Sequence, residues 1–268
     1  MNFFIFLILF LFFLLLFSSF RRPINAYFST YIAIVAHRGG FQNLAVENTT
    51  SAIAKALQKN KVDVFEIDLE FTKDHKVVVF HDDDLNRLGN INKLIEELTF
   101  EELQKIKLKQ GKFHARIETL DEFLKLQTKH QFRTILDVKP GKNNYKLAKG
   151  VYKLVKDYDL LHLTCITSFS PCLLLYFRLF DRELTLSMSV ERDSDSLFAR
   201  IYYKFLVDFL AHKLALSFLL IHSKLLSVDF IERKLKQGIQ VLPWTINDPE
   251  AKKFYERNKI GYLTDIIE

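Results

Sequence analysis

The feature that most constrains the fold is a regular alternation of short apolar segments with amphipathic segments from residue 31 onward. Apolar runs such as 31–36 (YIAIVA) and 133–138 (RTILDV) have the length and composition of β-strands. Runs such as 119–130 and 144–158 repeat apolar residues at helical spacing. Strand and helix alternate about seven times, which favours a parallel sheet built from β-α-β units.

The expected strands are apolar on both faces, as in sheets that are covered by helices or closed into a barrel. A (β/α)8 TIM barrel of the α/β class fits the 268-residue chain best, and a doubly wound open sheet is the second choice. The chain has no GxGxxG or P-loop motif, which weakens the second choice. The expected strands are 31–36, 62–72, 76–82, 133–138, 163–169, 183–190, 216–222, 239–247 and 260–265. The expected helices are 48–60, 98–106, 119–130, 144–158, 229–237 and 248–258, with two more starting at Pro171 and Asp195.

The N-terminus predicts a membrane segment. Residues 3–17 are apolar without a break, and the first charged residue is Arg21. A helix over this region would span roughly 30 Å, the thickness of one hydrocarbon core. A cleaved signal peptide is the competing interpretation, but the start is uncharged and no small-residue cleavage site follows. We therefore expect a retained single-pass anchor at 1–22, with Arg21 and Arg22 favouring a cytosolic catalytic domain at 23–268.

Composition narrows the other classes of function. The net charge is +6, but the lysines are scattered among acids, and no nucleic-acid-binding motif is present. The two cysteines, Cys165 and Cys172, have no metal-binding spacing and lie in apolar context, which predicts buried free thiols.

Residues 201–226 are strongly apolar, yet Asp208 and Lys213 would each cost about 2.5–3.5 kcal/mol in a spanning helix. We expect a barrel helix and strand there rather than a second span.

Polar residues appear where the expected barrel strands end, and active sites of such barrels lie at those carboxyl ends. The strand at 31–36 is followed by His37 and Arg38, and the strand at 62–72 contains Glu66 and Asp68. Later strands deliver His81, Asp137, Lys139 and Trp244 to the same end.

Spacing supports a shared site, because residues two apart on a strand point the same way. Glu66 and Asp68 share one face, as do Asp137 and Lys139. Three converging carboxylates favour a hard cation, Mg²⁺ or Ca²⁺. Two histidines suit general acid and base catalysis, and Arg38 and Lys139 suit a phosphate. This set predicts phosphodiester cleavage.

The motifs AHRGG (36–40), ENTTSAIAKAL (47–57) and FEIDLEFTKDHKVVVFHDDDLNR (65–87) resemble the glycerophosphodiester phosphodiesterase family. The later pieces ILDVKP, WTIND and LTD fit the same pattern, and the resemblance runs from Ile32 to the C-terminus. With the apolar N-terminus, the chain looks like the membrane-bound, lysophospholipase D branch. That branch implies a lysophospholipid or glycerophosphodiester substrate and location in the endoplasmic reticulum membrane, and no protein partner is expected.

The resemblance also implies roles for individual residues. His37 and His81 would be the catalytic acid–base pair. Glu66, Asp68 and Asp137 would hold one divalent cation, and Arg38 and Lys139 would bind the phosphate. Glu47 would support the loop of the first histidine, Asp82 would hold His81, and Trp244 would line the alcohol or lipid side of the pocket.

Two departures from the family pattern stand out. The family usually places Glu where Asp137 stands, and the chain stops soon after LTD (263–265), so we expect the last helix to be truncated. Two alternatives stay open. One is a sphingomyelinase D-like lipase, which has a similar two-histidine barrel, and the other is a non-enzymatic membrane protein on a decayed barrel, which the missing last helix would favour.

Overall fold

The structure is a computed structural model that describes residues 34–191 and 206–268. The expected anchor at 1–22 and the start of the helix expected from Asp195 lie outside these residues. Among the helices of the described residues, none is both long enough and apolar enough to cross a membrane.

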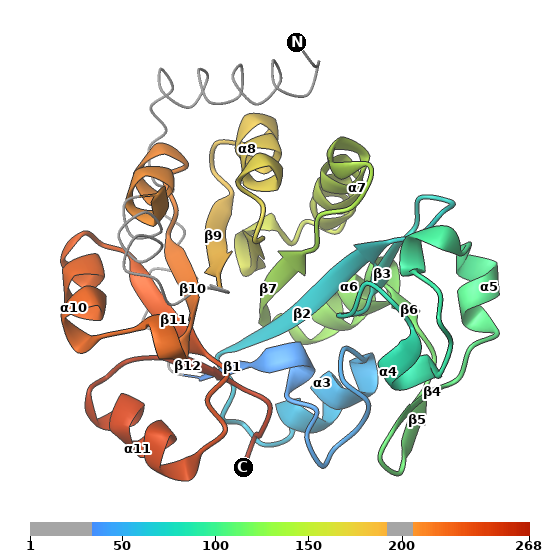
Figure 1. Cartoon of the computed structure of the whole chain (residues 1–268), viewed down its shortest axis with the longest axis horizontal. Coiled ribbons are helices and arrows are strands. Elements are labelled where there is room, and N and C mark those ends of the chain that lie inside the picture. The colour runs from blue at the N-terminus through green and yellow to red at the C-terminus, as the bar shows by residue number, and fades with distance from the viewer. Residues whose placement is uncertain (1–33, 192–205) are drawn as a thin grey trace.

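Eight parallel strands form a barrel, as the sequence predicts, with the first strand paired to the last (Figure 1). The strands are β1 (Ile34–Ala36), β2 (Val64–Phe71), β7 (Arg133–Val138), β8 (Thr164–Thr167), β9 (Thr185–Val190), β10 (Phe218–His222), β11 (Gln240–Trp244) and β12 (Tyr262–Thr264). Their hydrogen-bonded order is β11-β10-β9-β8-β7-β2-β1-β12. The Ile246 amide, just beyond β11, donates to the Leu263 carbonyl at 2.8 Å and joins the two ends of this order. Because the two ends of the strand order, β11 and β12, contact each other, the sheet is closed, which excludes a doubly wound open sheet.

Helices surround the strands (Figure 1). They are α3 (Thr50–Leu57), α6 (Leu120–His130), α7 (Asn144–Asp157), α8 (Pro171–Phe180), α10 (Val228–Lys236), α11 (Pro249–Arg257) and a helix at 206–213. Their starts follow from capping residues in the sequence. Thr119 and Glu122 form a capping box at α6, and Pro171 follows the N-cap Ser170 at α8. The described part of the apolar stretch 201–226 is a helix and the strand β10, as expected.

An inserted unit separates β2 from α6 and lies to one side of the barrel (Figure 1). It contains β3 (Val77–Val79), α4 (Asn86–Gly89), α5 (Phe100–Gln104), β4 (Leu108–Gln110), β5 (Phe113–Ala115), β6 (Glu118–Thr119) and the 3-10 turn Ile95–Glu97. β3 runs antiparallel to β2, so the predicted strand at 76–82 extends the sheet without entering the barrel. The β4–β5 hairpin was not predicted. The unit has a separate apolar cluster that includes Phe80, Leu85 and Leu103.

The barrel interior is filled by one inward residue from most strands, including Val35, Val64, Ile135 and Cys165. Cys165 is buried and free as predicted, whereas Cys172 is free but only half-buried. On β2 the outward residues pack against helices, while Val64, Glu66 and Asp68 point inward. The apolar filling therefore gives way to carboxylates toward the carboxyl ends of the strands.

Candidate active site

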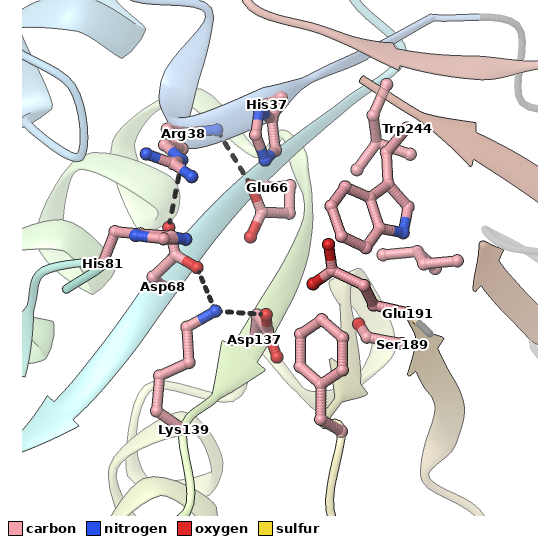
Figure 2. A pocket seen from close by; sticks show the side chains of 13 residues that line it. His37, Arg38, Glu66, Asp68, His81, Asp137, Lys139, Ser189, Glu191 and Trp244 are labelled. Carbon is pink, nitrogen blue, oxygen red and sulfur yellow. Dashed lines mark hydrogen bonds and ion pairs between the residues drawn. The ribbon is translucent and has the colours of Figure 1, made fainter. Parts of the chain in front are cut away.

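A pocket of about 280 Å³ opens at the carboxyl ends of the barrel strands. Figure 2 shows its side chains converging from β2, β7, β9 and β11 and from the turn after β1. The lining residues are His37, Arg38, Glu66, Asp68, His81, Asp137, Lys139, Phe169, Ser189, Glu191, Leu220, Trp244 and Leu263. All eight residues that the sequence assigned to catalysis, metal or substrate binding are among them. The two predicted supporting residues, Glu47 and Asp82, are not part of the lining, but they contact the lining residues Arg38 and His81, respectively.

Three carboxylates form the floor of the pocket. Glu66, Asp68 and Asp137 are each at most 5% exposed, and each offers an oxygen within 4.8 Å of the others. Asp68 and Asp137 are direct neighbours in the parallel pairing of β2 with β7. The Lys139 ammonium lies 2.7 Å from an oxygen of Asp68 and 2.7 Å from one of Asp137.

The electrostatics of this trio favour a bound cation. Burial, with the neighbouring charges of Asp68 and Asp137, raises the pKa of Glu66 well above its usual value. Burial also raises the pKa of Asp137, and Lys139 only partly offsets it. The Asp137 Oδ1 atom is buried without a hydrogen-bond partner among the described residues. These carboxylate oxygens are buried and clustered, and Lys139 offsets only part of their negative charge. Such a set of oxygen ligands fits a hard divalent cation.

The turn after β1 is built around positive backbone angles. Arg38 has φ 49°, and Gly39 and Gly40 have φ 82° and 67°. This turn aims the Arg38 amide at Glu66 Oε2, at 2.9 Å. A Cβ on Gly40 would lie 2.6 Å from Ile267 Cγ1, so the second glycine lets the C-terminal segment pack on the turn. The glycines after His37 therefore serve local geometry around the site.

His37 has a carboxylate partner that sequence reasoning missed. Its Nδ1 lies 2.6 Å from Asp265 Oδ1, just beyond β12. Asn247 donates to the other Asp265 oxygen at 2.7 Å. Burial raises the pKa of Asp265, but the hydrogen bonds from His37 and Asn247 and the charge of His37 outweigh it and lower that pKa. The motif LTD, which ends in this aspartate, was the available signal.

His81 has a carboxylate partner next to it in the chain. Its Nδ1 lies 2.6 Å from Asp82 Oδ1, the contact implied by the family resemblance. Arg87 Nε donates to Asp82 Oδ2 at 2.7 Å. Both histidines thus have Nδ1 engaged by a carboxylate, which leaves Nε2 as the atom available to a substrate.

The buried Glu47 carboxylate links Arg38 to Arg87 and Gln110 of the inserted unit. It is 3% exposed and accepts hydrogen bonds from Arg38 Nη1 at 2.9 Å and from Arg87. Gln110 of the inserted hairpin donates to Glu47 at 2.8 Å. Glu47 therefore binds Arg38, which lies in the same turn as His37. Asn48 donates to Asp68 Oδ2 at 2.8 Å and was also missed by sequence reasoning.

The arrangement suits the cleavage of a phosphodiester. Arg38 and Lys139 supply positive charge for a phosphate, and two oriented imidazoles can exchange protons on either side of it. An α/β barrel that brings these groups together at its carboxyl ends defines a phosphoric diester hydrolase. Comparisons with known proteins give the family. The chain belongs to the Glycerophosphoryl diester phosphodiesterase family, whose model matches residues 37–268.

Relatives agree with this assignment. Glycerophosphodiester phosphodiesterase 1 of Bos taurus is 28% identical, and the match covers 87% of this chain and 78% of that protein. Lysophospholipase D GDPD3 of Homo sapiens is 26% identical, with 87% and 82% covered. An Oleispira antarctica phosphodiesterase, solved with the product sn-glycerol-3-phosphate, has a TM-score of 0.73 at 23% identity, with 90% and 96% covered. Enzymes of this family are generally dependent on divalent cations.

Proposed function

We propose that the protein is a metal-dependent phosphodiesterase that releases the head-group alcohol from lysophospholipids and glycerophosphodiesters. The observation that carries the proposal is one pocket that combines a buried carboxylate trio with two carboxylate-oriented histidines. Glycerophosphodiester cleavage follows the family, and lysophospholipid cleavage is the finer part of the proposal. These intact groups favour an enzyme over a decayed barrel.

The residues of this chain divide the work. Glu66, Asp68 and Asp137 would hold one divalent cation, either Mg²⁺ or Ca²⁺, which would polarise the phosphate oxygens. Arg38 and Lys139 would orient the phosphate. One of His37 and His81 would take a proton from the attacking hydroxyl, and the other would protonate the leaving alkoxide. The attacking group is either water or a neighbouring hydroxyl of the substrate, the latter giving a cyclic phosphate that is then opened.

The lipid part of the proposal rests on two features. The pocket lining includes four apolar side chains beside the charged groups, those of Phe169, Leu220, Trp244 and Leu263. Residues 1–22 would anchor the domain in a membrane, which we place in the endoplasmic reticulum with the catalytic domain in the cytosol. The name of the human relative, a lysophospholipase D, agrees with such a substrate. A one-chain lipid is also available to an anchored enzyme at the membrane surface.

The test is release of choline by the full-length, detergent-solubilised chain from lysophosphatidylcholine and from glycerophosphocholine. Each assay is run with Mg²⁺, with Ca²⁺ and with EDTA. We expect metal-dependent release that EDTA stops and that His37→Ala abolishes. His114→Ala is the matched control, because His114 is exposed on β5 of the inserted hairpin.

The outcomes separate the parts of the proposal. Release that persists unchanged in excess EDTA would contradict the metal. Release from glycerophosphocholine alone would remove the lysophospholipid claim and keep the family activity. A preference for sphingomyelin over lysophosphatidylcholine would favour the sphingomyelinase D-like alternative. No release from a folded protein would return the decayed-barrel alternative.

A further inference from the structure

A second pocket lies where the barrel meets the inserted unit. Its volume is about 310 Å³, and it shares no lining residue with the catalytic pocket. Glu70 of β2 lines it, together with Asp83 and Glu96 of the inserted unit. Lys142, in the loop after β7, also lines it. The pocket thus contains three carboxylates, and the mechanism proposed above uses none of them.

Glu70 is the buried member of this group. It lies on the same face of β2 as Glu66 and Asp68, one step nearer the carboxyl end, because side chains two apart on a strand point the same way. Glu70 is only 8% exposed, and its Oε1 atom is buried without a hydrogen-bond partner among the described residues. A buried carboxylate without a partner costs free energy unless a cation or a hydrogen-bond donor reaches it.

The charges around Glu70 do not supply that cation. Burial and, after it, the negative charge of Asp83 raise the pKa of Glu70 to about 9, as expected for a carboxyl group that lacks a counter-ion. Lys139 borders Glu70 on the barrel side. Its ammonium, however, is held by Asp68 and Asp137 at 2.7 Å each.

The second lysine of the pocket is also already bound. The Lys142 Nζ atom lies 2.7 Å from Glu96 Oε1. Asp83 is exposed, and no hydrogen bond or ion pair engages its carboxylate within residues 34–191 and 206–268. With Glu70 ionised, three carboxylates face one ammonium in this pocket. One divalent cation would match the excess of negative charge.

The spacing of the carboxylates indicates how such an ion would be held. Unlike the catalytic trio, Glu70, Asp83 and Glu96 do not all bring an oxygen within 4.8 Å of one another. An ion here would therefore contact one or two of them directly and the rest through water, because Mg²⁺ usually keeps several waters and Ca²⁺ also accepts them. The space of about 310 Å³ leaves room for the ion with such waters.

We propose that Glu70, Asp83 and Glu96 form a second divalent-cation site, separate from the catalytic trio, that joins β2 to the inserted unit. Asp83 follows Asp82, which holds His81 Nδ1 at 2.6 Å. An ion shared by these carboxylates would therefore fix the loop that carries His81 against the barrel. The inference goes beyond the proposed function and does not depend on it, because its test measures binding and stability alone.

The test counts the ions bound per chain by equilibrium dialysis of the EDTA-treated, full-length protein against Ca²⁺ and, separately, against Mg²⁺. The test variants are Glu70→Gln and Asp83→Asn, and the second changes an exposed side chain, so its folding should be undisturbed. Glu101→Gln is the control, because it removes an exposed carboxylate of α5 that does not line the pocket. We expect each test variant to bind one ion fewer than the wild type and the control to bind the same number.

Unfolding temperature gives a second measurement. Asp137→Asn weakens the catalytic site, so it isolates the proposed one. In this variant Ca²⁺ should still raise the unfolding temperature, and adding Glu70→Gln should abolish the rise. An unchanged ion count in both test variants would overturn the inference, as would an equal loss in Glu101→Gln. Loss of every bound ion in Asp137→Asn would overturn it too, because the trio would then be the only site.

Discussion

Asp265→Asn tests whether His37 is an oriented catalytic base or acid. The Asp265 carboxylate lies 2.6 Å from His37 Nδ1, and the two side chains are only 17% and 12% exposed. Asn247 donates to the second Asp265 oxygen, so an amide at position 265 would turn its oxygen toward Asn247. Its NH2 group would then face His37 Nδ1 and favour the tautomer with the proton on Nε2.

The structure sets the size of the effect. A hydrogen bond to a charged group contributes about 1.5–3 kcal/mol, and little solvent is present here to screen it. If that energy is expressed in the transition state, kcat should fall about 10- to 150-fold. KM and the metal requirement should change little, because Asp265 is not part of the carboxylate trio.

The assay is kcat and KM for glycerophosphocholine, together with the unfolding temperature. Asp248→Asn is the matched control, because Asp248 is the exposed N-cap of α11 and Asn caps a helix equally well. A kcat within about twofold of wild type, in a variant with unchanged unfolding temperature, would refute the orienting role. A loss of stability with no separate loss of kcat would make Asp265 merely structural.

Three further predictions concern the metal, the fold and the pH dependence of stability. Asp137→Asn should raise the Mg²⁺ concentration for half-maximal activity by more than about tenfold, measured by metal titration after EDTA treatment. Arg178 is fully buried and donates to four backbone carbonyls, so Arg178→Met should cost about 3–5 kcal/mol in urea unfolding. Burial raises the pKa of Asp82, but hydrogen bonds from His81 and Arg87 outweigh it and lower that pKa from 3.8 to about 2. This carboxylate therefore stabilises the fold above about pH 4 and loses its effect as the pH falls toward 2, so the stability gap between wild type and Asp82→Asn should narrow from pH 6 to pH 3.

The barrel could be predicted because its strands obey a simple rule. Most of the strands carry apolar residues on both faces, and most are followed in the chain by a helix with a recognisable start. On β2, the in–out alternation of a strand is also enough to predict that Glu66 and Asp68 share one face. The β4–β5 hairpin was not predicted because its strands are short and partly exposed. Their sequences, LKQ and FHA, do not show the alternation of apolar and polar residues that indicates a strand.

The site could be predicted only in part, for a physical reason. Residues at strand ends are brought together by the barrel itself, so position along a strand was enough to find them. Arg87, Gln110 and Asp265 lie on a short helix, a hairpin and the C-terminal segment, and their partners follow from tertiary packing. Glu191 was missed because a single carboxylate after a strand has no distinguishing spacing.

The two histidine–aspartate pairs depend on different parts of the fold. His81 and Asp82 are adjacent in sequence, and Arg87 ties their loop to Glu47. His37 and Asp265 are 228 positions apart and meet because β1 pairs with β12. Glu47 also binds Arg38 in the turn after β1. Because Arg87 of the inserted unit binds the same carboxylate, Glu47 connects the inserted unit with the turn next to the β1–β12 pairing. Both imidazoles are therefore oriented only when the barrel is closed and the inserted unit is docked, which couples assembly of the active site to completion of the fold.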